Sequence, residues 1–174
     1  MAHFNCLLTI AVLSFVSTSD AFCNNPFHEV GSACLLVNSK DKMNWTQARD
    51  YCKSLSYSID PTDLAVVTNC QDLNPIWQYL LLDHVLDEYW LGGYDIEQEG
   101  VWHWVSSKLV NMGVPFWPAN IPDGGPNENC LMLTAAGFFD DADCSEEKHV
   151  ICSPHSQSPS ERQGSARPPT TRHT

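Results

Sequence analysis

The stretch NIPDGGPNENC, residues 120–130, gathers side chains that can hold a hard cation. Asp123, Asn127 and Glu128 offer the oxygen ligands that calcium prefers, and two prolines and a Gly-Gly pair stiffen the backbone around them. The alternative is a plain turn, because Asp and Gly tolerate the backbone angles that turns require. Residue types leave both interpretations open, so the choice depends on what the rest of the chain supplies.

Other chemistries lack the residues that they need. His28-Glu29 begins like a zinc-protease helix, but position 32 is Ser rather than His, and there is no CxxC pair to hold zinc. The sequence contains neither a Gly-x-Ser-x-Gly nucleophile motif nor a phosphate-binding loop. Because no nucleophile–base pair is evident either, we expect a binding protein and not an enzyme.

The two ends of the chain differ in composition from its middle. Residues 1–21 carry an apolar run and then small residues at a cleavage spacing, which predicts a secretory signal peptide. Residues 153–174 are rich in Ser, Pro and Arg and predict a disordered tail, which leaves 22–152 as one domain. No apolar run is long enough to span a bilayer, so we expect a secreted, extracellular protein. The formal net charge of −12 disfavours nucleic acid as a partner.

The cysteines indicate how such a domain would be stabilised. The chain has 8 cysteines, and all except Cys6 lie beyond the predicted signal peptide. In an exported chain this content indicates a disulfide framework. Because the remaining number is odd, at least one thiol stays free or pairs with another chain.

Two early helices and a series of short strands would position the cation-binding stretch. The first helix is expected over WTQARDYCKSL with Asn44 as its cap, and its helical spacing predicts a core face of Trp45, Ala48, Cys52 and Leu55. The second is expected over DLNPIWQYLLLDHVL, with Asp72 or Asn74 as its cap and Pro75 in its first turn. A short strand pair is expected within residues 22–37, with CLLV as its better strand. Further strands are expected at DLAVVT, EYWLGGYD, GVWHWVSS, CLMLTA, FFDDADC and KHVIC, and a long loop at 106–129. This order favours an α+β fold, and long loops inside compact domains are usually functional.

Several motifs, taken in order, resemble the long form of the C-type lectin domain. WTQARDYC resembles the family's first-helix pattern, WLGGYD its WIGL core strand, and EGVWHWVSS the Gly-x-Trp-x-Trp strand that follows. Trp117 precedes Asp123 as the family's Trp precedes the last residue of its EPN or QPD tripeptide. Glu128-Asn129-Cys130 matches the family's E-D-C, and Phe139-Asp140-Asp141 its W-N-D. The resemblance covers nearly all of 22–152 and implies a disulfide-stapled α+β fold with a long calcium-binding loop.

The same resemblance implies one disulfide pairing: Cys23–Cys34, Cys52–Cys152 and Cys130–Cys144. The third bridge would hold Glu128 beside the Asp140-Asp141 pair. Cys70 has no partner in this framework. It is therefore either a free, half-buried thiol or the link of a disulfide-joined dimer.

The resemblance also implies which residues would bind the family's sugar-binding calcium. Its ligand positions correspond to Ile121, Asp123, Glu128, Asp140 and Asp141, and the resemblance places carbohydrate at Ile121, Asp123, Glu128 and Asp140. The four carboxylates are expected to bind Ca²⁺, whereas Ile121 offers no side-chain oxygen. IPD keeps the Asp of the galactose-type QPD but loses its Gln, so the sugar type, and whether sugar binding survives, stay open. The family also implies a cis peptide bond before Pro122, although trans is the default for X-Pro bonds.

The expected function is that of a secreted, calcium-dependent carbohydrate-binding lectin. By resemblance to soluble lectins of invertebrate immunity, its ligands would be glycans on microbial surfaces. The alternative is a calcium-independent protein-binding domain in which IPD marks a degenerate sugar site. NWT is also a glycosylation sequon at Asn44, where a glycan competes with the capping role.

Overall fold

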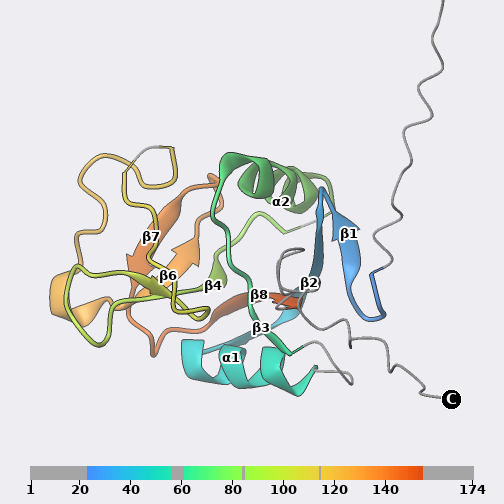
Figure 1. Ribbon diagram of the computed structural model, residues 1–174, viewed down its shortest axis with the longest axis horizontal. Coiled ribbons are helices and arrows are strands. Elements are labelled where there is room, and N and C mark those ends of the chain that lie inside the picture. Colours follow the sequence, from blue (N-terminus) through green and yellow to red (C-terminus); the bar gives the residue numbers. More distant parts are fainter. Residues whose placement is uncertain (1–22, 56–60, 84, 114, 155–174) are drawn as a thin grey trace, which may run out of the picture.

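The computed structural model describes residues 23–55, 61–83, 85–113 and 115–154. The predicted signal peptide and residues 155–174 of the predicted tail lie outside these residues. Helices α1 (Trp45–Ser54) and α2 (Cys70–Asp83) lie on opposite sides of a central sheet, and the long loop extends from one end of it (Figure 1). The arrangement confirms the predicted α+β fold.

The sheet has the strand order β1-β2-β8-β4-β6-β7, with β3 added on β8 and β5 on β4. Its pairs are antiparallel except β4 with β8, which run parallel. The strands are β1 (His28–Val30), β2 (Ala33–Met43), β3 (Thr62–Leu64), β4 (Tyr89–Tyr94), β5 (His103–Trp104), β6 (Cys130–Leu133), β7 (Phe139–Ala142) and β8 (Lys148–Pro154).

Helix α1 begins where its cap predicts. The Asn44 side chain accepts a hydrogen bond from the Gln47 N–H at 2.9 Å, and the Gln47 side chain accepts from the Asn44 N–H, which completes a capping box. Trp45, Ala48 and Cys52 are buried, as their spacing predicts, and Leu55 packs against the same core. A glycan at Asn44 would therefore have to form beside an occupied capping group.

Helix α2 begins earlier than predicted. It starts at Cys70 rather than near Asp72, because Asn69 caps it: the Asn69 Oδ1 accepts from the Asp72 N–H at 2.9 Å. Pro75 therefore lies inside the helix and not in its first turn. A Cβ on Gly31, in the β1–β2 turn, would come within 2.8 Å of the Pro75 ring, so this proline packs against the hairpin.

Several strand boundaries also differ from prediction; β2, for example, continues to Met43, well beyond the expected CLLV. The DLAVVT strand is shorter, since β3 ends at Leu64, although Ala65 still donates to the Ile151 carbonyl at 2.8 Å. Only His103–Trp104 of GVWHWVSS forms a strand, yet Trp102 and Trp104 are both buried as the alternation predicts. Strand β8 continues to Pro154, two residues past the predicted domain end, because Ser153 and Pro154 pair with β3.

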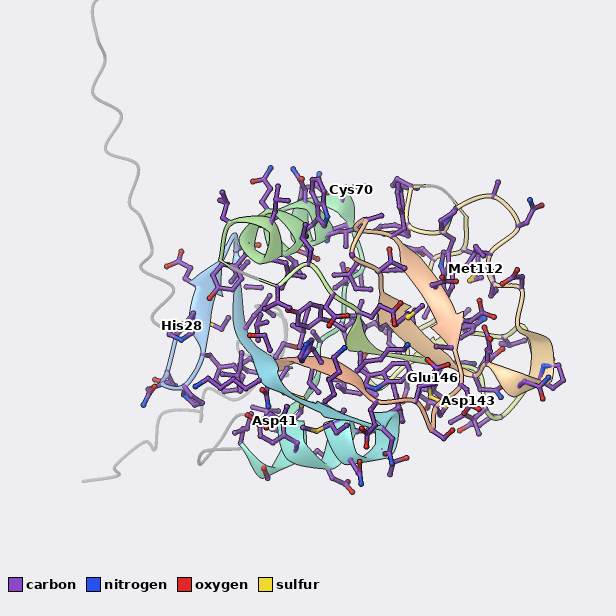
Figure 2. All side chains as sticks on the ribbon, turned by 180° about the vertical axis from the view of Figure 1, so that it is seen from behind. His28, Asp41, Cys70, Met112, Asp143 and Glu146 are labelled. Atoms are coloured by element: carbon purple, nitrogen blue, oxygen red, sulfur yellow. A yellow bond between two sulfur atoms is a disulfide. The ribbon has the colours of Figure 1, made fainter. Side chains whose placement is uncertain are left out.

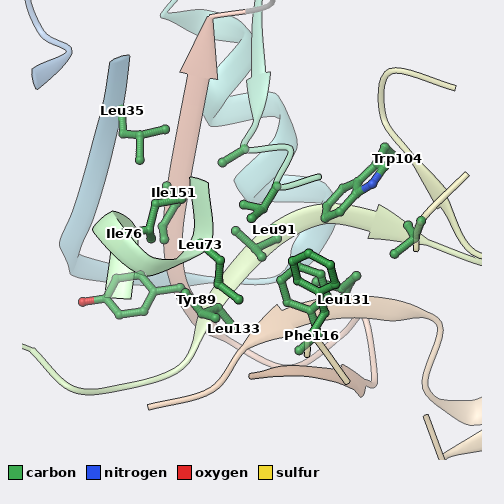
Figure 3. Close-up of a cluster of buried hydrophobic side chains, with 14 of the residues drawn as sticks. Leu35, Leu73, Ile76, Tyr89, Leu91, Trp104, Phe116, Leu131, Leu133 and Ile151 are labelled. Atoms are coloured by element: carbon green, nitrogen blue, oxygen red, sulfur yellow. The ribbon is translucent and has the colours of Figure 1, made fainter. Parts of the chain in front are cut away.

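Two hydrophobic clusters fill the interior, one on each side of the sheet. The cluster beneath α1 includes Trp45, Trp90 and Val150. The larger cluster lies beneath α2 and extends under the long loop, and its residues include Leu35, Leu73, Ile76, Tyr89, Leu91, Trp104, Phe116, Leu131, Leu133 and Ile151 (Figure 3).

The disulfides form as predicted: Cys23–Cys34, Cys52–Cys152 and Cys130–Cys144. Among the cysteines of the described residues, Cys70 alone is free. It lies exposed at the start of α2 (Figure 2), which differs from the half-buried thiol that was one of the two alternatives. A thiol at the surface remains accessible to a second chain.

Buried aromatic side chains of the long loop pack against the sheet and anchor the loop there. Between β5 and β6 the described residues contain one short 3-10 turn, η1 (Gly125–Asn127), and neither a further strand nor an α-helix. Trp117 is fully buried, its Nε1 donates to the Asn111 carbonyl at 3.1 Å, and its ring lies 5.3 Å from Trp102 and 5.7 Å from Phe139. Phe116 stacks on Phe139 at 5.2 Å. The loop therefore leaves β5 and returns over β7 on a rigid base.

Candidate metal centre

Three of the predicted ligands meet where the loop crosses β7. Asp123 lies in the loop, Glu128 directly follows η1, and Asp141 lies in β7. One carboxylate oxygen of each lies within 4.8 Å of the others. Asp123 is exposed, Glu128 is half-buried and Asp141 is buried, so the cluster opens to solvent on one side and is closed by the sheet on the other.

Covalent and backbone features bring these residues together. The Cys130–Cys144 bridge ties the start of β6 to the segment after β7, and Leu131 pairs with Asp141 across the two strands. The Ile121–Pro122 peptide bond is cis, as the resemblance implies. After Pro122, the backbone N–H groups of Asp123 and Gly124 lie within hydrogen-bond distance of Asp141 in β7.

Asp141 binds the loop backbone directly. The Asp123 N–H donates to Asp141 Oδ1 at 3.1 Å, and the Gly124 N–H donates to Asp141 Oδ2 at 2.7 Å. Each carboxylate oxygen can accept more than one bond, so both retain a lone pair for a cation. Gly124 also leaves room for Glu128, because a Cβ there would lie 2.3 Å from the Glu128 Cβ and Oε2.

Asp140, the fourth predicted ligand, lies outside this group of three. Successive strand residues point to opposite faces, so Asp140 and Asp141 diverge at the backbone. The Asp140 carboxylate nevertheless remains within electrostatic reach of Asp141, Asp123 and Glu128, and its Oδ1 accepts from the Asp141 N–H at 3.1 Å. It borders the cluster.

The cluster has an excess of negative charge. Burial, followed by the Asp141 charge, raises the pKa of Asp140 to about 6. The pKa of Glu128 is raised in the same way, by burial and then by Asp141 and Asp123. Crowded carboxylates of this kind are costly without a counter-charge, which a divalent cation would provide.

Asp95, which the sequence predicts only as the end of a core strand, is part of this acidic region. It is 2% exposed; its Oδ2 accepts from the Gly100 N–H at 2.7 Å, and its Oδ1 is buried with no hydrogen-bond partner. Burial and then the Asp141 charge raise its pKa. The signal in the sequence was an Asp that ends a buried strand and begins the acidic run DIEQE.

Ile121, the predicted ligand position without an oxygen, packs against the larger hydrophobic cluster. Its half-buried side chain thus extends the core beneath the loop. The donors that remain are carboxylate oxygens. Hard oxygen donors, an unpartnered buried oxygen on Asp95 and an uncompensated charge fit a hard divalent cation such as Ca²⁺.

A family model described as "Lectin C-type domain" matches residues 41–154. Hepatic lectin of Gallus gallus is 24% identical over 115 residues, which cover 66% of this chain and 51% of the lectin. Perlucin of Haliotis laevigata is 28% identical over 134 residues, which cover 75% of this chain and 81% of perlucin. The chain thus spans about half the length of hepatic lectin and most of perlucin.

Solved structures share the fold. The C-type lectin CEL-I from Cucumaria echinata superposes with a TM-score of 0.67 at 22% identity, over 76% of this chain and 97% of that one. A calcium-independent type II antifreeze protein superposes with a TM-score of 0.62 at 20% identity, over 76% and 95% of the two chains. At these identities the likeness establishes the fold alone.

Proposed function

The chain belongs to the C-type lectin domain family, and on that premise we propose that it is a secreted, calcium-dependent carbohydrate-binding protein. Its ligands are glycans of microbial surfaces, recognised as part of innate immunity. The observation that carries the proposal is the convergence of Asp123, Glu128 and Asp141 within 4.8 Å on a pinned loop. The family is one of binding domains, in keeping with the expectation that the chain is not an enzyme.

Calcium would be held by Asp123, Glu128 and Asp141, with Asp140 at the border of the site. When bound, the cation supplies positive charge and open coordination positions for sugar hydroxyls. The carboxylates around it can accept hydrogen bonds from the same hydroxyls, whereas the side chain of Ile121 can neither donate nor accept one. A sugar therefore loses one of its usual partners, and we expect weaker binding than at a site with an amide in this position.

Export from the cell is supported by the three disulfides, which persist in oxidising compartments. Neither helix of the described residues is long and apolar enough to cross a membrane. A dimer joined through Cys70 stays a prediction, to which the structure adds that the thiol is exposed.

A calcium titration by calorimetry followed by a glycan array tests the proposal. The wild-type protein should take up calcium and bind glycans, and an excess of chelator should abolish glycan binding. Asp123→Ala should lose both, while Asp143→Ala, an exposed Asp outside the cluster, should keep both. An absence of calcium uptake by the wild-type protein would overturn the proposal.

The second candidate is a calcium-independent protein-binding domain. The packing of Ile121 into the core favours it, because this removes a ligand position from the site. One structural neighbour is also described as a calcium-independent antifreeze protein. Binding of a protein ligand that persists in chelator and survives Asp123→Ala would support this candidate over the first.

A further inference from the structure

The two N–H groups that follow Pro122 in the loop have the same acceptor. Asp141 receives the Asp123 N–H on Oδ1 at 3.1 Å and the Gly124 N–H on Oδ2 at 2.7 Å. The acceptor is 3% exposed and lies on a strand of the sheet, so water competes poorly for these bonds. Hydrogen bonds from backbone N–H groups to a carboxylate are among the stronger ones in proteins.

Gly124 lies between two of the candidate ligands. Its N–H points to Asp141, while the Glu128 side chain occupies the space that a Cβ would need, 2.3 Å from Glu128 Cβ and Oε2. A side chain at position 124 would displace Glu128. The same short segment thus fixes the position of Glu128 relative to Asp141 and carries Asp123 beside them.

We propose that Asp141 is a positioning residue that holds the 123–124 segment in its ligand-binding arrangement when no metal is present. Both hydrogen bonds form between groups of this chain, so they need no cation. Calcium then binds a loop that is already ordered, and less of its binding free energy is spent on ordering the loop. This inference rests on the proposed function for what the site binds, but the order of the metal-free loop stands on the hydrogen bonds alone.

Amide hydrogen exchange of the full-length protein in chelator, followed by NMR, tests the inference. In the wild type, the Asp123 and Gly124 amides should exchange at least ~10-fold more slowly than the unstructured chain, because opening must break a bond to a buried acceptor. Exchange at the unstructured rate would overturn the proposal, and this result needs no variant.

Two matched substitutions separate local positioning from general stability. Asp141→Asn keeps one acceptor oxygen but replaces the other with an NH₂ donor, so at least one of the two amides should lose ~10-fold in protection. Amides of β4 should not change. Asp140→Asn, the same substitution one residue earlier, should leave both loop amides protected, because Asp140 accepts from neither. Unchanged protection in Asp141→Asn, or equal loss in both variants, would overturn the proposal.

The proposed function is tested by a different measurement, which is calcium binding by calorimetry. If calorimetry detects no calcium while the two amides stay protected, the calcium site is wrong and the positioning role of Asp141 stands. If calcium binds but the metal-free amides are unprotected, the cation and not Asp141 orders the loop. In that case the positioning role is wrong.

Discussion

The metal-free domain should become more stable as pH falls from 7.5 to 5, which is the reverse of ordinary acid denaturation. The reason is Asp140, whose pKa is raised from 3.8 to about 6 by burial and by the charge of Asp141. A carboxyl group whose pKa is higher in the folded state takes up its proton on the folded protein first. Its destabilising effect is therefore full above about pH 6 and is relieved as pH falls through that value toward 3.8.

The size of the effect follows from the shift. About 2 pKa units correspond to about 3 kcal/mol at most. Asp140 is half-buried, so solvent screening reduces this to about 1 kcal/mol. For a domain of this size the full change would raise Tm by about 3 °C. Because pH 5 lies about midway between the two pKa values, about half of this rise is expected between pH 7.5 and pH 5. Raised pKa values at Glu128 and Asp95 act in the same direction, whereas the lowered pKa of Asp87 has its effect below this pH window.

Thermal unfolding followed by circular dichroism, in chelator and in calcium, is the assay. Calcium at 100 times its Kd should add about 2.7 kcal/mol at pH 7.5, and this gain should shrink as the ligands take up protons. The two Tm curves should therefore converge toward pH 5. Asp140→Asn should flatten the chelator curve, and Asp143→Asn should not, because the pKa of Asp143 is lowered. A Tm in chelator that decreases steadily as pH is lowered from 7.5 to 5 would refute the reasoning.

Three further variants test the scaffold by urea unfolding. The paired Cys52→Ser and Cys152→Ser change opens a loop of 100 residues and should cost about 4–5 kcal/mol; a loss below about 1 kcal/mol would contradict the loop-entropy account. Asn44→Ala removes the cap of α1 and should cost about 1 kcal/mol, whereas Asn44→Ser should be nearly neutral; equal losses would argue against capping. Lys148→Met leaves two half-exposed carboxylates that water can solvate and should cost about 1–2 kcal/mol; a loss above about 4 kcal/mol would show that those carboxylates depend on the ammonium.

The disulfides, α1 and the sheet could be predicted because their signals are local or belong to ordered motifs. The start of α2 could not, because two signals competed. Pro75 favours the first turn of a helix, but Asn69 and Asp72 form a cap three residues apart that sets the start at Cys70. In the folded chain, Pro75 also lies against the turn at Gly31, a contact that the sequence alone does not show.

The candidate site likewise contains residues that the sequence predicts and one that it does not. Asp123, Glu128 and Asp141 were expected because family motifs carry them, and the structure brings them together. Asp95 lies in a different motif. It comes within electrostatic reach of Asp141 because β4 pairs with β6 and the Asp95 N–H donates to the Asn129 carbonyl at 3.2 Å. The bonds from Asp141 to the loop also depend on how the backbone returns over β7, which residue types do not specify.

The two ends of the described domain lie close together and far from the long loop. Cys23 is bridged to Cys34, and Leu36, two residues further along β2, pairs with Cys152 near the end of β8. In Figure 1 both ends lie on the side of the sheet opposite the loop. A copy attached to a support or to another copy through either end would therefore present its loop outward. When several copies are tethered in this way, the second contact with a repetitive surface becomes intramolecular, and avidity can offset a weak single site.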